Sequence, residues 1–144
     1  MSRYLPEAWA LPIIDDLNRE FFTSGKLMLQ QCAGCKTVQH PPEEVCHHCQ
    51  GMEFVHVESA GLGVVYSYVV VHYPAHQELQ SAVPYAVVLV QLDDYPAVRI
   101  VGNCLNAEPD EIETGMAMRV RWEAITDAET GERLRMPQWG TVRE

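Results

Sequence analysis

The chain has 144 residues, of which 47% are hydrophobic. This suits one medium domain, or a small domain with an appendage, and excludes wholesale disorder. The net charge of −10 disfavours binding to nucleic acid or anionic lipid over most of the surface, and no apolar run approaches the roughly 20 residues that span a bilayer. Because the N-terminal stretch carries Asp15, Asp16 and Glu20 and lacks the basic start of a secretory signal, we expect a soluble cytoplasmic protein.

Residues 12–24 predict an N-terminal helix. Pro12 suits a first helical position, and Gly25 suits the residue after a helix end. Apolar residues recur along one side of this segment and would either pack on the core of the chain or dock on a partner protein. The candidate partner-docking residues are Ile13, Leu17, Phe21 and Phe22.

The next segment holds four of the five cysteines as two Cys-x-x-Cys pairs: Cys32 and Cys35, then Cys46 and Cys49. Each pair can turn as a tight knuckle, and two knuckles together supply four thiolates in the tetrahedron that Zn²⁺ accepts. Gly34 is expected at a position with positive φ inside the first knuckle. Two disulfides are the alternative, but a reducing cytosol argues against them.

The four cysteines therefore predict a metal site, with zinc the first choice and iron the second. Four sulfur ligands leave no open position for a substrate, so the expected role is structural. His40, His47 and His48 lie nearby, and we expect them to be solvated or outside the ligand set. Cys104 stands alone in an apolar neighbourhood and is expected to be a small buried hydrophobe.

Short β-strands are predicted through the rest of the chain. Residues 26–31 and 36–40 would flank the first knuckle as a hairpin. After the second knuckle, runs rich in β-branched and aromatic residues predict strands at 54–57, 63–72, 85–92, 96–104, 118–125 and 133–139. A turn is expected at 127–132 and a short helical turn at 108–113. Five closely spaced antiparallel strands favour a small closed barrel of the OB type over a sandwich.

We therefore expect a mainly β chain with three parts. These are an N-terminal helical arm at residues 1–26, a rubredoxin-like zinc ribbon at 27–55 and a five-stranded OB-fold barrel at 56–144.

Four stretches of sequence are similar to one known family: GKLMLQQCAGCKTVQHPPEEVCHHC, SAGLGVVYSYVVVHYP, VPYAVVLVQLDDYPAVRIVGN and IETGMAMRVRWE. Together they resemble the acyl-CoA-associated family known as domain of unknown function thirty-five, over about residues 12–140. The double knuckle alone is generic, whereas its combination with these strand motifs is specific. The resemblance implies the same order of helical arm, zinc ribbon and OB-fold.

The resemblance also implies a function. Members are accessory subunits of thiolase-fold enzymes, such as acetyltransferases and aldolases, or of MaoC-type enoyl-CoA hydratases, and they are thought to help bind or pass on the acyl-CoA thioester. The partner enzyme would carry the catalytic residues. One departure is Glu43, which stands where family members often have an arginine after Pro-Pro; an acid there would weaken a contact with a CoA phosphate.

Basic and aromatic side chains are the candidate contacts for an acyl-CoA. Arg119 and Arg121 are two positions apart on one predicted strand, so they share a face and suit phosphate groups, although a solvated barrel face is the plainer interpretation. The full candidate set is Lys26, Lys36, Tyr66, Tyr68, Arg99, Arg119 and Arg121.

Two other functions compete with the accessory role. Zinc ribbons and OB barrels also bind single-stranded nucleic acid, but twenty acidic against ten basic residues count against that function here. A stand-alone acyl-CoA enzyme would use His72 or His76, which lie in a predicted loop. Polar loop residues are the plainer interpretation of both.

Overall fold

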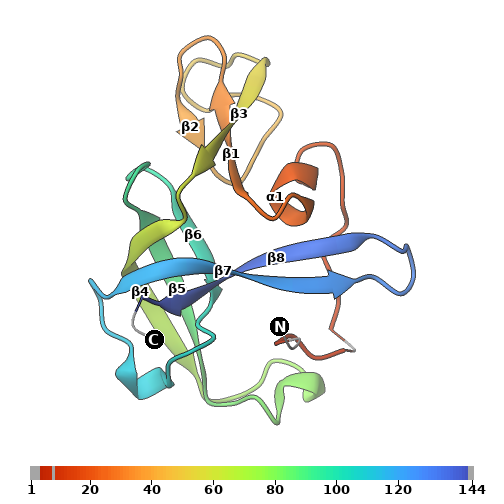
Figure 1. The fold of residues 1–144 in the computed structure, drawn as a ribbon, viewed down its shortest axis with the longest axis vertical. Coiled ribbons are helices and arrows are strands. Elements are labelled where there is room, and N and C mark those ends of the chain that lie inside the picture. Colours follow the sequence, from red (N-terminus) through yellow and green to blue (C-terminus); the bar gives the residue numbers. More distant parts are fainter. Residues whose placement is uncertain (1–3, 8, 143–144) are drawn as a thin grey trace.

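The structure is a computed structural model that describes residues 4–7 and 9–142 (Figure 1). One short helix, α1 (Arg19–Thr23), precedes a three-stranded sheet of order β2-β1-β3. Its strands are β1 (Leu27–Cys32), β2 (Val38–Gln39) and β3 (Phe54–Ser59). A five-stranded sheet of order β6-β5-β4-β7-β8 follows. Its strands are β4 (Leu62–Val71), β5 (Tyr85–Leu92), β6 (Arg99–Asn103), β7 (Ala117–Thr126) and β8 (Arg133–Thr141).

These eight strands coincide with the eight predicted runs, and their ends differ by a few residues. The mainly β architecture with a ribbon followed by a barrel is therefore confirmed. The predicted turn at 108–113 contains a 3₁₀ helix at Pro109–Glu111, and the turn at 127–132 closes the β7–β8 hairpin with Gly131 at φ +77°. A second 3₁₀ helix, Gln77–Leu79, lies in the β4–β5 loop.

The five-stranded sheet closes into a barrel. β4 pairs with both β5 and β7, and the two end strands meet through a parallel bridge between Cys104 and Trp139. The backbone N–H of Leu105 donates to the carbonyl of Trp139 at 2.8 Å beside this bridge. A first strand paired with the second and fourth, and a parallel contact between the third and fifth, is the OB topology.

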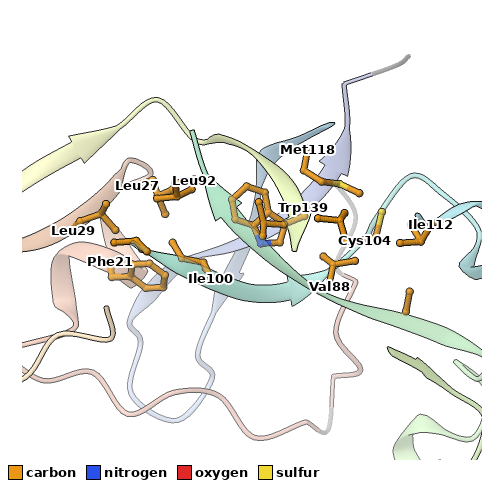
Figure 2. Packing of buried hydrophobic residues seen from close by; sticks show 14 residues of the cluster. Phe21, Leu27, Leu29, Val88, Leu92, Ile100, Cys104, Ile112, Met118 and Trp139 are labelled. Atoms are coloured by element: carbon orange, nitrogen blue, oxygen red, sulfur yellow. The ribbon is translucent and has the colours of Figure 1, made fainter. Parts of the chain in front are cut away.

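One hydrophobic core serves both sheets. Figure 2 shows Phe21 of α1 and Leu27 and Leu29 of β1 at one end of the cluster, and Met118 and Ile112 at the other. Trp139 lies between these ends and is 0% exposed. The ribbon therefore packs on the barrel through shared apolar side chains, and the two lobes are continuous in the core.

Two glycines allow strands to approach closely. A Cβ on Gly102 would lie 2.8 Å from Cδ1 of Trp139, and a Cβ on Gly63 would lie 2.3 Å from the carbonyl oxygen of Gln91. Real Cβ contacts do not come this close to fixed groups, so any larger residue would push β6 away from the indole or β4 away from β5.

The joint between the two lobes is short and held by one carboxylate. Asp94 accepts hydrogen bonds from the Ser59 hydroxyl and from the Ala60 backbone N–H, both at 2.8 Å. The Gly61 N–H in turn donates to Ser59 Oγ at 3.1 Å. Because these bonds span the two residues between β3 and β4, they fix how the ribbon meets the barrel. We refer to them as the Asp94 clamp.

The N-terminal helix is shorter than the sequence predicts, and the expectation of helix over residues 12–18 is wrong. The backbone N–H of Asp15 donates to Asn18 Oδ1 at 2.8 Å, and the N–H of Asn18 donates to Asp15 Oδ1 at 2.9 Å. Asn18 Nδ2 also donates to the carbonyl of Ile13 at 3.0 Å. The reciprocal pair has the arrangement of a capping box, and the Arg19 N–H donates to the Asp15 carbonyl at 3.1 Å, so the first turn starts at Asp15 and leaves residues 12–14 outside it.

A buried carboxylate holds the start of the described chain. Glu123 on β7 is 0% exposed and accepts hydrogen bonds from the backbone N–H groups of Tyr4 and Leu5. Gln138 of β8 donates to its other oxygen at 3.0 Å and accepts from the Asn103 N–H of β6 at 2.9 Å. This network ties the arm to three barrel elements.

In the described part of the chain, no helix has the length and apolarity to cross a membrane.

Candidate metal centre and contact residues

The four predicted cysteine ligands converge at one point. The sulfur atoms of Cys32, Cys35, Cys46 and Cys49 all lie within 4.8 Å of one another. The Cys32–Cys49 and Cys35–Cys46 sulfur pairs are 3.5 and 3.6 Å apart. Sulfurs at about 2.3 Å from a tetrahedral zinc would be roughly 3.8 Å apart, so the arrangement fits Zn²⁺. All four thiols are free, which excludes the disulfide alternative in this structure.

The two knuckles share one backbone geometry. The N–H of Lys36 donates to the Cys32 carbonyl at 3.0 Å, and the N–H of Gln50 donates to the Cys46 carbonyl at 2.9 Å. Both donors have positive φ, 67° for Lys36 and 62° for Gln50. The expectation that Gly34 takes this conformation is wrong, because the left-handed residue follows the second cysteine of each pair.

Glycine at these two positions should stabilise the ribbon. Non-glycine residues pay about 1 kcal/mol in the left-handed region, so we expect Lys36→Gly and Gln50→Gly each to raise the unfolding free energy by roughly 0.5–1 kcal/mol. Urea unfolding of the zinc-loaded protein measures this. Lys36→Ala is the matched control and should give no gain. If Lys36→Ala raised the unfolding free energy by the same amount, the destabilisation would come from the Lys36 side chain and not from its positive φ.

Two buried glutamines support the second knuckle. Gln39 Nε2 of β2 donates to Gln30 Oε1 of β1 at 2.7 Å, and the His47 N–H donates to Gln39 Oε1 at 3.0 Å. Gln30 bonds both the carbonyl and the N–H of Glu43. The amides thus satisfy the loop backbone that leads to Cys46. We did not predict that Gln30 supports the loop. The sequence does hold a signal for it, because Gln30 is two positions before Cys32 on one strand and therefore points to the same face.

The protein environment favours the thiolate form of the first knuckle. The hydroxyl and backbone N–H of Thr37 lower the pKa of Cys35 to about 5, and the Cys35 N–H lowers the pKa of Cys32. The His48 N–H also donates to Cys46 Sγ at 3.4 Å. Because zinc binds thiolates, these donors reduce the proton release that metal binding requires.

The histidines lie outside the sulfur cluster. His47 and His48 are exposed. His40 is half-buried, and its ring lies 4.8 Å from that of Phe21. Burial lowers the pKa of His40 to about 4. His40 is therefore a neutral packing residue between the ribbon and α1.

This burial predicts a pH dependence of stability. Unfolded histidine titrates near pH 6.5, so between that value and about 4 the unfolded state binds more protons, and stability falls as pH falls. We expect the unfolding free energy of zinc-loaded protein to drop less from about pH 7 to about pH 5 in His40→Gln than in wild type. The exposed His56 gives the control, since His56→Gln should keep the wild-type slope.

The structure brings together only part of the predicted acyl-CoA set. Arg99 of β6 lies over the Tyr66 ring of β4, with 3.8 Å between the guanidinium carbon and the ring centroid. Arg119 and Arg121 alternate along β7, opposite Gly140 and Gln138 of β8. The remaining candidates are exposed. They are Lys26 before β1, Lys36 in the first knuckle and Tyr68, which lies on β4 with Tyr66.

The arm residues are divided between the core and the surface. Phe21 is in the core, Phe22 packs against it, and Leu17 is half-buried. Only Ile13 of the four docking candidates is largely exposed, at 88%. Leu17, Phe21 and Phe22 line one side of a groove of about 700 Å³ between the arm, the ribbon and strands β6 and β8.

The remaining sequence candidates have simple environments. Cys104 is buried, as predicted, and burial raises its pKa. His72 and His76 are exposed, and the ring of His76 lies edge-on to Trp9 at 4.9 Å.

Two family models match consecutive parts of the chain. Residues 19–55 match a model described as ChsH2, rubredoxin-like zinc ribbon domain. Residues 56–123 match one described as ChsH2, C-terminal OB-fold domain. The four candidate ligand cysteines all lie within the first of these matches.

Two curated proteins are similar to the chain in sequence. A "probable enoyl-CoA hydratase alpha subunit" of Thermomonospora curvata is 41% identical over 114 residues, covering 77% of this chain. The chain spans only 34% of that protein's length. A "DUF35 domain-containing scaffold protein" of Methanocaldococcus jannaschii is 30% identical over 98 residues, covering 67% of each chain.

A solved structure is also similar. A chain of the "Ltp2-ChsH2(DUF35) aldolase" is 37% identical, with a TM-score of 0.74, and the match covers 91% of this chain and 98% of that one. The resemblance drawn from the sequence motifs is confirmed by these matches. The chain belongs to the DUF35 family, whose members join a zinc ribbon to an OB-fold.

Proposed function

We propose that this chain is a non-catalytic scaffold subunit that docks on a thiolase-fold acyl-CoA enzyme and acts in the cytoplasm. One observation carries the proposal. The chain matches, over almost the full length of the matched chain and at 37% identity, a structure named as a complex of Ltp2 with ChsH2(DUF35). The family resemblance implies a thiolase fold for such an aldolase partner, and the relative from Methanocaldococcus jannaschii is itself named a scaffold protein.

The metal chemistry supports a structural role. Four thiolates would complete a tetrahedral zinc shell, so a bound ion would have no position left for a substrate or an activated water. The zinc instead fixes two loops that have few apolar side chains of their own. The centre shapes the ribbon, and the reacting groups belong to the partner enzyme.

A MaoC-type hydratase is the second candidate partner. The relative from Thermomonospora curvata is named as a probable enoyl-CoA hydratase alpha subunit and is 41% identical to this chain. This sequence similarity favours a hydratase as the partner. Both partners act on acyl-CoA thioesters, so the scaffold role is common to the two.

Within this role, we propose that Arg119 and Arg121 are the main contacts of this chain with the CoA phosphates. They stand two positions apart on β7, where Arg119 is exposed and Arg121 is half-buried. The peripheral contributors are Lys26, Lys36, Tyr66, Tyr68 and Arg99. Among the proposed docking residues, Ile13 has the largest exposed fraction to offer a partner. The others, Leu17, Phe21 and Phe22, would act by holding the arm against the rest of the chain.

A tagged pull-down from the native host tests the scaffold role. Proteins retained at ordinary expression are identified by mass spectrometry. A stoichiometric thiolase-fold enzyme is the expected result, and a MaoC-type hydratase in its place would select the second candidate. If neither is retained, and the purified chain alone turns over an acyl-CoA, the scaffold proposal is wrong.

A further inference from the structure

The outer face of strands β4, β5 and β6 carries apolar side chains that are half-buried on the central strand β5 and mainly exposed on β4 and β6. Strand pairing places Val69, Val87 and Asn103 in one row across these strands, and Leu89 beside Val101 in the next. Val69 and Val101 are 59% and 61% exposed. We define the outer-face patch by five residues: Tyr66, Val69, Val87, Leu89 and Val101.

A β-bulge adds the aromatic member of this patch. The register between β4 and β5 shifts between Val65 and Ser67, which leaves Tyr66 as the extra residue. A bulge redirects its side chain locally, and here the Tyr66 ring lies under Arg99 and stays 45% exposed. The bulge thus turns a large aromatic surface outward.

The sequence of β5 fits a strand that is covered on both faces. Its inward residues, from Ala86 to Leu92, are buried in the barrel core. Three of its four outward residues, Tyr85, Val87 and Leu89, are apolar or aromatic, and the fourth is Gln91. An antiparallel strand with one face in solvent normally alternates apolar and polar side chains. A second layer over the patch would account for this pattern.

The charge of the patch indicates the kind of surface that covers it. The chain carries 20 acidic residues, yet the described rows of this face, from Val64–Gln91–Arg99 to Val71–Tyr85, contain none. Arg99 is the charged group there. A complementary surface would be apolar and would place a carboxylate near the Arg99 guanidinium.

The size of the patch requires that the interface extend beyond it. Three strands spaced about 5 Å apart, with roughly five residues each, give an area of about 250 Å². A stable interface covers about 800 Å² on each partner. The patch continues through Val101 into the groove between the arm and β6, so the two together form one larger apolar surface.

We infer that the outer-face patch is the surface that packs against the thiolase-fold enzyme. This inference rests on the proposed function and deepens it, because it names the face of the barrel that makes the contact. The enzyme surface opposite would be apolar, with an acidic side chain set against Arg99.

Charge substitutions on the patch test this inference. The chain is co-expressed with the enzyme identified in the pull-down, and binding is measured on the purified full-length proteins. Val69→Glu and Val101→Glu should each weaken binding at least tenfold, with zinc content and melting temperature unchanged, because both side chains are mainly exposed. Val55→Glu is the matched control, since Val55 is also an exposed valine on a strand, 47% exposed on β3 of the ribbon.

The outcomes separate the two proposals. Wild-type affinity in both patch variants would overturn the outer-face interface while leaving the scaffold role intact. Equal weakening by Val55→Glu would also overturn it, since added charge anywhere would then have the same effect. A wild-type dimer that Val101→Glu converts to monomer, with enzyme binding unchanged, would assign the patch to a second copy of the chain. Failure of the wild-type chain to bind the enzyme would instead reject the proposed function.

Discussion

Replacing a knuckle cysteine should release the metal and unfold the ribbon. We expect Cys49→Ser, on the exposed side of the cluster, and Cys32→Ser, on its buried side, both to lose stoichiometric zinc. Zinc binding to such sites contributes on the order of 10 kcal/mol or more to folding. Leu27 and Leu29 belong to the common core, so barrel stability should fall by several kcal/mol as well.

Metal analysis of desalted protein, combined with amide hydrogen exchange over β1 to β3, measures both parts of this result. The same analysis distinguishes zinc from iron in the wild type. Cys104→Ala is the control because Cys104 is a buried cysteine of the barrel, outside the cluster, and this variant should keep full metal content. Full stoichiometry in both knuckle variants would show that the four-sulfur assignment is wrong.

Truncating the central tryptophan should be the most destabilising change in the barrel. Trp139 is 0% exposed and lies at the parallel bridge that closes the barrel between β6 and β8. Trp139→Ala would leave a cavity there and should lower the unfolding free energy by about 3–5 kcal/mol. Urea unfolding followed by circular dichroism measures this in the zinc-loaded protein.

Two further variants make the result interpretable if the alanine variant does not fold. Trp139→Phe keeps most of the buried volume and removes an indole N–H that has no hydrogen-bond partner, so its cost should be smaller. Trp122→Ala truncates a half-buried tryptophan on the neighbouring strand β7 and should also cost less than Trp139→Ala. Equal costs for Trp139→Ala and Trp122→Ala would contradict a special role of Trp139 in barrel closure.

The strands and the metal site were predictable because their signals are local. Alternation and β-branched runs mark β4 and β5 whatever they pair with, and the spacing of Cys32, Cys35, Cys46 and Cys49 carries the ligand geometry within the sequence. The extent of the helix was not predictable from its apolar stripe, because Asp15 and Asn18 bond to each other's backbone and place the first turn after Ile13 and Ile14. The position of the left-handed residue in each knuckle was obscured because Lys36 and Gln50 stand there in place of glycine.

The features that hold the parts together were not predictable, because they join residues far apart in sequence. Glu123 looks like an ordinary strand acid, and only the fold places it under the N–H groups of Tyr4 and Leu5. Arg99 and Tyr66 meet across β5 because a bulge turns the ring outward. In each case the chemistry depends on register and closure, which no short stretch of sequence specifies.

The Asp94 clamp has a consequence for the thermodynamics of association. With Ser59 and Ala60 bonded to one carboxylate, the joint between the two lobes has less freedom to bend. Partners that order a flexible joint when they bind lose conformational entropy, and this lowers their affinity. A subunit that presents ribbon and barrel at a fixed angle avoids this loss and imposes its own geometry on whatever it joins. Loosening the clamp would therefore weaken assembly through this entropy cost.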